Sequence, residues 1–220
     1  GRRADRRWWY GDAVNLLKKE VIMPKEILFD EEVVLRRATE LFWTRGYNAT
    51  SMDELTRITG LSRSSIYNSF GGKHALFMRC LRYYLGDQQR QLHELAGKVK
   101  PVVPRIRAAF QYAVEEILAD RMRKGCMMVN TTTEMVNQDK DIAAVSAENM
   151  EQMEGIFANW ISEGQAAREI STAFNPQMLA RHLFNTYSGL KVSGKTRPDR
   201  KTLEDLVTVA LSVLEGPGAS

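Results

Sequence analysis

The chain of 220 residues lacks several features that mark proteins outside the ordinary globular class. It has only two cysteines, Cys80 and Cys126, which cannot build a disulfide framework, and it contains no C-x-x-C motif. No apolar run approaches the ~18 residues that span a bilayer. The 6 prolines and 15 glycines are too few for a collagenous or low-complexity chain. These absences predict a globular protein of a reducing, cytoplasmic setting with no membrane association.

Patterns that carry catalysis or metal binding are also missing. The three histidines, His74, His93 and His182, belong to no Ser/His/acid arrangement and to no metal-ligand spacing. No glycine-rich phosphate motif occurs either. We therefore expect no enzymatic activity, no metal and no cofactor other than a small-molecule or redox effector.

The sequence does have a helical periodicity from Phe29 onward, and no stretch alternates as a strand would. Helix starts are marked by Asp30 and by Ser51-Met52-Asp53-Glu54, which fits a capping box, and stops are marked by glycines. The pattern predicts an all-α fold of nine helices. Their expected ranges are 30–46, 51–59, 62–70, 73–100, 106–118, 126–137, 140–166, 176–192 and 200–214.

Positive charge is concentrated in the first 85 residues. Residues 1–22 carry six Lys or Arg against three Asp or Glu, residues 23–85 carry nine against seven, and residues 86–220 carry sixteen against seventeen. This asymmetry predicts a polyanion-binding front half joined to a part with another task. The stretch 1–22, with four arginines before Trp8-Trp9-Tyr10, is interpreted as a non-native extension or as a basic arm for a DNA minor groove.

Two short helices joined by Thr59-Gly60-Leu61 predict a helix-turn-helix. On a helical wheel of the second helix, one side carries groups that hydrogen-bond base edges or phosphates, and the other side carries packing residues. A merely solvated polar face is the alternative interpretation. The first side consists of Arg63, Ser64, Tyr67 and Asn68, and the second of Ser62, Ile66, Ser69 and Phe70.

The segments Gly46-Tyr47-Asn48-Ala49-Thr50-Ser51-Met52, Gly60-Leu61-Ser62-Arg63-Ser64-Ser65-Ile66-Tyr67 and Phe70-Gly71-Gly72-Lys73 closely resemble the DNA-binding domain of TetR-family transcriptional repressors. The resemblance implies phosphate contacts at Thr50, Tyr67 and Lys73, and base-facing positions at Arg63, Ser64, Ser65 and Asn68. Ser51 belongs to the same DNA-binding set. The pair Asn68-Ser69 departs from the aromatic or His pair common in the family, which bears on the operator sequence.

Gly125-Cys126-Met127-Met128-Val129-Asn130 is similar to a branch of the family in which a Gly-Cys pair opens the sixth helix. Members of that branch sense electrophiles or oxidants, copper, or small organic ligands. A thiol near a helix N-terminus is favoured as thiolate, and Lys191 is a candidate cation beside it. Packing as a small buried hydrophobe is the alternative for Cys126, and it is the interpretation for Cys80. The candidate effector set is Cys126, Met127, Asn130, Glu134 and Lys191, with Thr131 and Thr133 as further polar groups.

The segment 200–214 carries two apolar stripes, one of Leu203, Val207, Ala210 and Leu214 and a second of Leu206, Val209 and Val213. Two stripes imply burial on two sides. The resemblance implies a homodimer whose last two helices form a four-helix bundle. The candidate interface residues are Leu183, Tyr187, Leu206, Val209 and Val213.

Together these patterns predict an N-terminal extension over 1–22 and a helix-turn-helix domain over 23–72. A connecting helix over 73–100 and an effector-binding and dimerisation domain over 101–220 follow. The predicted function is a cytoplasmic, homodimeric repressor that binds double-stranded operator DNA. It is released by a reactive or redox compound at Cys126, or by a small ligand in the C-terminal pocket. A non-specific architectural DNA-binding protein is the alternative function, and a copper-responsive protein is the alternative sensor.

Overall fold

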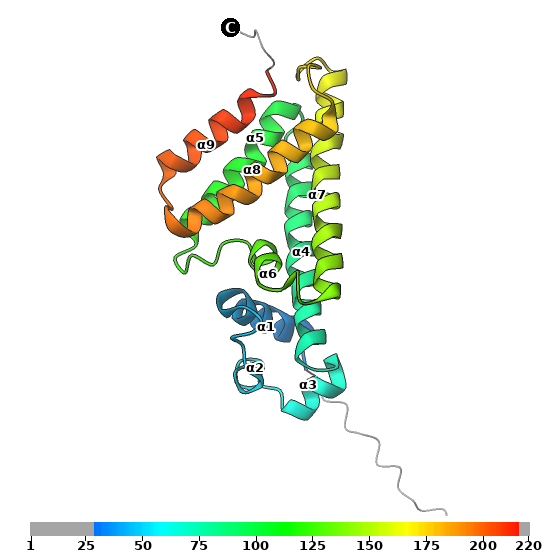
Figure 1. Cartoon of the computed structure of the whole chain (residues 1–220), viewed down its shortest axis with the longest axis vertical. Coiled ribbons are helices and arrows are strands. Elements are labelled where there is room, and N and C mark those ends of the chain that lie inside the picture. The colour runs from blue at the N-terminus through cyan, green and yellow to red at the C-terminus, as the bar shows by residue number, and fades with distance from the viewer. Residues whose placement is uncertain (1–28, 216–220) are drawn as a thin grey trace, which may run out of the picture. The chain divides into compact units, whose positions relative to one another are not determined.

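The computed structural model describes residues 29–215, and every regular element in that range is a helix, as the periodicity predicts (Figure 1). The first four are α1 (Glu31–Arg45), α2 (Met52–Thr59), α3 (Arg63–Phe70) and α4 (Lys73–Lys98). The other five are α5 (Val102–Ala119), α6 (Met127–Met135), α7 (Lys140–Ala166), α8 (Pro176–Thr196) and α9 (Arg200–Ser212). None of these described helices has the length and apolar character that crossing a membrane requires. The expected extension over 1–22 lies outside the described residues.

Local chemistry sets most helix ends where the sequence predicts them. The Ser51 side chain accepts a hydrogen bond from the Glu54 N–H, and the Glu54 carboxylate accepts one from the Ser51 N–H. The capping box of α2 is therefore complete. Gly60 and Gly71, both left-handed, end α2 and α3. The start of α5 differs from the prediction, because Pro104 lies in its first turn rather than before it. A proline there removes no helical hydrogen bond.

Helices α1, α2, α3 and the first turns of α4 enclose a small core at one end of the molecule (Figure 1). Leu55 of α2 and Ile66 of α3 are fully buried in this core. Phe42 and Phe77 meet there edge to face, with ring centroids 4.9 Å apart. This core holds α2 and α3 as a supported pair rather than as isolated short helices, which would be marginal in water.

The second part of α4 packs with α5, α7, α8 and α9 around a larger core. Leu183 and Tyr187 of α8 belong to this core, so their expected place in a dimer interface is wrong. Tyr187 packs edge to face against Phe110 at 5.6 Å and lies 6.2 Å from Phe157. Both residues lie on the side of α8 that faces α5 and α7, and burial there leaves them no surface for a partner.

The second apolar stripe expected in 200–214 is partly exposed, and its place in a dimer interface stays a prediction. Val209 is 71% exposed and Leu206 is 39% exposed, while Val213 is half-buried against the core. On the neighbouring helix α8, Met178 and Val192 are each 51% exposed. One protomer therefore leaves an apolar surface on α9, and two isolated apolar side chains on α8, that its own core does not cover.

Candidate functional site

The outer side of α3 presents the polar groups that the helical wheel predicts. Arg63, Ser64, Tyr67 and Asn68 are exposed, and Tyr67 keeps 58% of its surface accessible. Ile66 anchors the helix from the other side, where it is fully buried. We call the exposed residues Ser51, Arg63, Ser64, Tyr67 and Asn68, with the half-buried Lys73, the reading surface.

Two residues expected to contact DNA lie inside instead. Ser65 is buried, and its hydroxyl lies 2.9 Å from the hydroxyl of Ser62, the N-cap of α3. The wheel had placed Ser62 inward, but as N-cap it lies outside the regular helix and is exposed. Thr50 is 1% exposed, and its hydroxyl donates to the Gly46 carbonyl at 2.7 Å. Ser65 and Thr50 therefore stabilise the turns that hold the reading surface and are not part of it.

Arg63 has an acidic neighbour that the sequence analysis missed. Its guanidinium donates to the Asp53 carboxylate at 2.7 Å, and both side chains are largely exposed. This ion pair raises the pKa of Arg63. An exposed pair of this kind adds little stability, so Arg63 can exchange Asp53 for an acceptor on a base edge. The acidic residue in the first turn of α2 was visible in the sequence, but its distance from Arg63 depends on the turn between the two helices.

The Gly71-Gly72 turn brings Tyr67 and Lys73 to the same end of the reading surface. Gly72 has φ +111°, and a Cβ there would lie 2.9 Å from Cε1 of Tyr67. A glycine is thus needed both for the turn and for the close approach of the ring. Lys73 opens α4, its ammonium lies 4.3 Å from the centre of the Tyr47 ring, and partial burial lowers its pKa.

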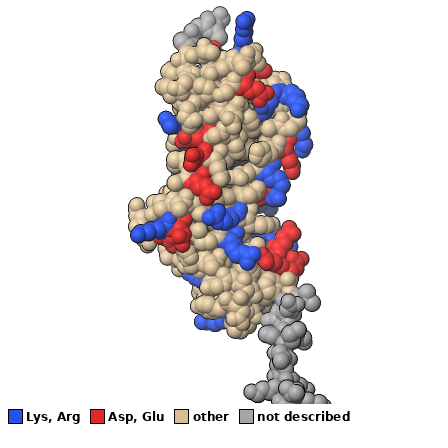
Figure 2. Space-filling model, turned by 90° about the vertical axis from the view of Figure 1, so that its right-hand side faces the viewer, with Lys and Arg blue, Asp and Glu red and all other residues tan. Residues whose placement is uncertain are grey.

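Charge is mixed on one face of the molecule. On the face that Figure 2 shows, Lys and Arg alternate with Asp and Glu, and no large patch of one sign covers that face. This face therefore lacks the broad basic surface that non-specific DNA binding requires.

The loop between α5 and α6, residues 120–126, connects the helical core to α1, and we call it the junction loop. The Trp43 indole N–H of α1 donates to the Gly125 carbonyl at 2.9 Å. Lys124 bonds the Glu40 carboxylate of α1 at 2.8 Å and lies 4.0 Å from the centre of the Trp43 ring. These contacts fix α1 to the loop at two consecutive residues.

Gly125 suits this position for two reasons. It has φ +69°, and a Cβ there would lie 2.8 Å from Cδ of Lys195 on α8. Its N–H donates to the Asp120 carboxylate at 3.1 Å, which closes the loop on itself. The next residue, Cys126, is the N-cap residue of α6, as the sequence predicts.

The Cys126 thiol is half-buried and faces the core. It accepts a hydrogen bond from the Tyr84 hydroxyl at 3.6 Å. Burial, and next the proximity of Cys126, raise the pKa of Tyr84 well above its usual range. A cavity of about 50 Å³, lined by Cys126, Met128 and Met153 among others, lies beside the thiol. It is much smaller than ligand pockets of about 300–1,000 Å³.

Three members of the predicted effector set do not face this cavity. Met127 is 1% exposed and packs in the core. Asn130 donates to the Lys124 carbonyl at 2.7 Å and accepts from Lys195 at 3.0 Å, so its amide holds the junction loop at one end and α8 at the other. The Glu134 carboxylate accepts the backbone N–H groups of Tyr47 at 3.1 Å and Asn48 at 2.8 Å. Thr131 is buried, and the Thr133 hydroxyl bonds backbone carbonyls.

The Glu134 contact has a clear physical cause. The chain leaves α1 at Gly46, and the next two backbone N–H groups need acceptors from another element. A carboxylate from α6 provides them, so α6 is bonded directly to the turn before α2. Glu134 is therefore a link between the two parts of the molecule rather than a ligand contact.

Lys191 lies near Cys126 but already has an anionic partner. It is 6% exposed and bonds the Glu116 carboxylate of α5 at 2.5 Å. A buried lysine requires such a partner, because desolvation would otherwise favour its neutral form. The sequence analysis missed Glu116, since nothing local to residue 116 marks it.

A second polar junction joins α4 to α7. His74 bonds the Asp139 carboxylate at 2.7 Å, and Asp139 also caps α7 by accepting the N–H groups of Asp141 and Ile142. His74, Asp139 and Asp141 offer possible metal-ligand atoms within 4.8 Å of one another. Because the cap and the ion pair already occupy Asp139, we assign these residues a structural role.

Comparison with known proteins agrees with this architecture. Residues 34–80 match the family model described as bacterial regulatory proteins, tetR family. Residues 102–210 match the model of a tetracyclin repressor-like C-terminal domain. The first match ends within α4 and the second begins at α5, so the second half of α4 lies between the two matched ranges.

Two curated relatives align over most of the chain. The uncharacterized HTH-type transcriptional regulator YezE of Bacillus subtilis is 29% identical over 188 residues, which cover 85% of this chain and 97% of YezE. The HTH-type transcriptional repressor ComR of Escherichia coli is 28% identical over 205 residues, covering 92% of this chain and 95% of ComR.

Solved structures share the fold. A cysteine mutant of the TetR family transcriptional regulator CifR, complexed with 26 bp double-strand operator DNA, superposes with a TM-score of 0.76 at 24% identity, covering 84% of this chain and 97% of CifR. The reduced form of Escherichia coli NemR superposes with a TM-score of 0.76 at 20% identity, covering 86% of this chain and 98% of NemR.

Proposed function

Because this chain belongs to the TetR family of bacterial regulatory proteins, we propose that it binds double-stranded operator DNA as a homodimer and represses transcription until a small effector releases it. ComR is named a transcriptional repressor, and CifR was solved on operator DNA. The family consists of regulators rather than enzymes. We place its action in the cytoplasm, where DNA lies and where the free thiols Cys80 and Cys126 stay reduced.

The observation that carries the DNA proposal is the reading surface on α3. Arg63, Ser64 and Asn68 offer a guanidinium, a hydroxyl and an amide on one exposed side of a helix that fits the major groove. Tyr67 and Lys73, at the other end, suit phosphate contacts that fix the position of the helix. Ser51, the exposed N-cap of α2, suits the same purpose.

The dimer proposal follows from the uncovered apolar surface on α9. The described residues of one protomer contain a single helix-turn-helix, and one such motif contacts only one half-site. Pairing the faces that include Val209 and Leu206 would bury them and bring two reading surfaces to one side of the dimer. A near-palindromic operator is the expected target.

The architectural alternative fits the molecule less well. A non-specific binder relies on many phosphate contacts from a broad basic surface. Here the face in Figure 2 is mixed in charge, and the polar groups of α3 are types that distinguish bases.

For the effector, we assign the sensing role to Cys126. An electrophile such as N-ethylmaleimide would add to the thiol. A bond forms between Sγ and an alkene carbon, and the thiol proton ends on the neighbouring carbon. The cavity of about 50 Å³ beside the thiol has no room for the adduct. Because the core around the thiol is closely packed, the bulk of the adduct should displace whole helices.

The contacts of the junction loop supply a path for this shift. Cys126 follows Gly125, whose carbonyl holds Trp43 of α1, and it precedes α6, whose Glu134 holds the turn before α2. A displacement of the loop would therefore tilt α1 and the reading surface. Operators tolerate little error in the spacing of half-sites, so a small tilt in each protomer is enough for release.

The test begins with the selection of operator sites from a random DNA pool. Operator binding is then measured for the parent, Cys126→Ser and Cys80→Ser, before and after treatment with N-ethylmaleimide, peroxide or Cu(I). Cys80 is the matched control, because it is buried and burial raises its pKa to about 12. We expect the parent and Cys80→Ser to release DNA and Cys126→Ser to retain it.

Two results would contradict the proposal at different points. Absence of any preferred site in the selection would refute operator recognition. Release of Cys126→Ser as readily as the parent would refute the thiol as sensor while leaving operator recognition intact. Release by Cu(I) alone, lost in Cys126→Ser, would identify the copper-responsive alternative, in which Met128 and Met153 offer thioethers to the same metal.

A further inference from the structure

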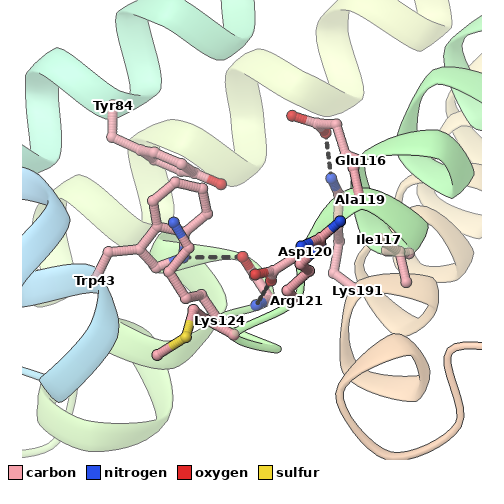
Figure 3. A pocket seen from close by; sticks show the side chains of 11 residues that line it. Trp43, Tyr84, Glu116, Ile117, Ala119, Asp120, Arg121, Lys124 and Lys191 are labelled. Atoms are coloured by element: carbon pink, nitrogen blue, oxygen red, sulfur yellow. Dashed lines mark hydrogen bonds and ion pairs between the residues drawn. The ribbon is translucent and has the colours of Figure 1, made fainter.

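A cavity of about 450 Å³ lies where α1, α4, α5, α8 and the junction loop meet (Figure 3). Trp43 and Tyr84 form one wall, and Glu116 and Lys191 lie on the opposite side. Its volume falls in the range of small-molecule sites, unlike that of the cavity beside Cys126. It also includes a residue of α1, so a molecule bound there would touch the part of the chain that carries the reading surface.

The aromatic wall favours a flat, apolar ligand body. The Trp43 and Tyr84 rings meet at 5.0 Å and 64° and both line the cavity, with the Lys124 ammonium 4.0 Å from the centre of the Trp43 ring. Ile117, Ala119 and Met122 extend the apolar lining. Aromatic ligand rings pack well against such surfaces in offset or edge-to-face geometry.

Most charges around the cavity are already satisfied. Glu116 and Lys191 bond each other at 2.5 Å, and Lys124 bonds Glu40 at 2.8 Å. The Asp120 carboxylate accepts the N–H of the next loop glycine at 3.1 Å. A ligand gains little from groups whose partners it would have to replace.

Arg121 is different. It lines the cavity, is exposed, and its guanidinium has no hydrogen bond or ion pair with any residue in the range 29–215. A guanidinium binds a carboxylate through two parallel hydrogen bonds, and such bonds are stronger than those between neutral groups. The free cation beside an aromatic wall therefore selects a planar anion.

We propose that this cavity binds a small aromatic carboxylate, with its ring against Trp43 and Tyr84 and its carboxylate on Arg121. Binding there places the ligand beside the bond between the Trp43 indole and the Gly125 carbonyl. The ligand would thus regulate the position of α1 without reacting with Cys126. Only this regulatory consequence rests on the proposed function, because binding itself needs no DNA.

Calorimetry on the full chain, without DNA, tests the binding site. Naphthoate, naphthamide and naphthylmethylamine share a two-ring body and differ in charge. We expect naphthoate to bind at least about tenfold more tightly than the other two, as a charge-assisted bidentate pair would require. Arg121→Gln should weaken naphthoate about tenfold and leave naphthamide unchanged.

Two further variants separate the cavity from general effects. Arg123→Gln removes a cation from the same loop that does not line the cavity, and it should bind naphthoate as the parent does. Ala119→Trp fills the cavity from an exposed position at the end of α5 and should abolish binding of every probe. Circular dichroism and thermal unfolding verify that each variant is folded.

The proposal is overturned if no probe shows saturable binding, if the three probes bind alike, or if Arg121→Gln and Arg123→Gln weaken naphthoate equally. Operator binding is then measured with and without saturating naphthoate in Cys126→Ser. Tight naphthoate binding with no effect on the operator would refute the regulatory consequence and leave the binding site standing. Binding to no operator at all would be a failure of the proposed function instead.

Discussion

The reading surface and the junction loop are built in opposite ways. The turns that hold α2 and α3 close through residues near each other in the chain, as in the capping box between Ser51 and Glu54, three positions apart. The contacts of the junction region join distant positions, since Trp43 and Gly125 are 82 positions apart and Glu116 and Lys191 are 75 positions apart. The first region is specified by local rules, and the second exists only once the whole fold has formed.

This difference separates their tasks. A surface that contacts DNA needs a rigid shape, and caps and glycine turns set most of it locally, on the core that α1 and α4 provide. In a sensor, a structural change at one site must alter the structure of a distant site. Only contacts between residues far apart in the chain transmit such a change. Substitutions confined to one of the two regions should therefore affect DNA binding and long-range stability separately.

The largest expected effect concerns the apolar face that pairs two reading surfaces. Val209→Asp should give monomers and lower operator affinity about a hundredfold or more, because the second half-site no longer benefits from effective concentration. Analytical ultracentrifugation and operator titration measure the two outcomes. Met150→Asp, at a 51% exposed position on α7, should leave both unchanged. A Val209→Asp protein that remains dimeric would show that the interface lies elsewhere.

Within the reading surface, Arg63→Ala should weaken the preferred operator by roughly ten- to hundredfold, since a bidentate base contact contributes about 1–3 kcal/mol. Random DNA should be affected much less. Asp53→Asn removes the ionic partner and keeps Arg63, so base preference should persist. Equal losses on operator and random DNA for Arg63→Ala would make Arg63 a phosphate contact.

In the junction region, Glu134→Gln should lower the free energy of unfolding by about 1–2 kcal/mol, because one of the two backbone N–H groups loses its acceptor and the other keeps only a neutral one. Urea unfolding measures this value. The matched control is Glu151→Gln on the exposed side of α7, which should change it by less than about 0.5 kcal/mol. Identical stability of the two variants would argue that Glu134 does not hold the turn after α1.

The smallest effect is a pH dependence at Asp139. The Ile142 N–H, followed by His74, lowers the pKa of this carboxyl in the folded state. A lowered folded pKa contributes stability above the unfolded value of about 3.9, and this contribution is lost as the pH falls through the folded pKa. Asp139→Asn should therefore cost at most about 1 kcal/mol at neutral pH. Unfolding curves across the acid range should show the difference shrink, and a constant difference would contradict the assignment.

Sequence reasoning succeeded where the determinants are local. The capping box at Ser51, the glycine stops and the α3 face of Arg63, Tyr67 and Asn68 follow from spacing alone. It failed at Ser65, which the family resemblance places among the base-facing residues but which is buried in this structure. The N-cap hydroxyl of Ser62 then draws the Ser65 side chain inward.

In the second half the helices were predictable and the partners were not. Leu183 and Tyr187 are apolar residues that suit a core or an interface equally, and only the packing of α5 and α7 places them inside. Glu134 and Asn130 look like polar pocket groups until distant backbone groups are found to bond them. Nothing in the sequence around Glu134 indicates that its carboxylate accepts a backbone N–H from Tyr47, 87 positions earlier in the chain.

The central claim is that the junction loop controls the reading surface, and the most direct measurement is hydrogen exchange at the backbone amides of Tyr47 and Asn48. Both donate to Glu134, so their protection reports whether α6 still holds the turn before α2. After N-ethylmaleimide treatment, protection should fall in the parent and stay unchanged in Cys126→Ser. Alkylation that releases the operator while both amides keep their protection would contradict this account.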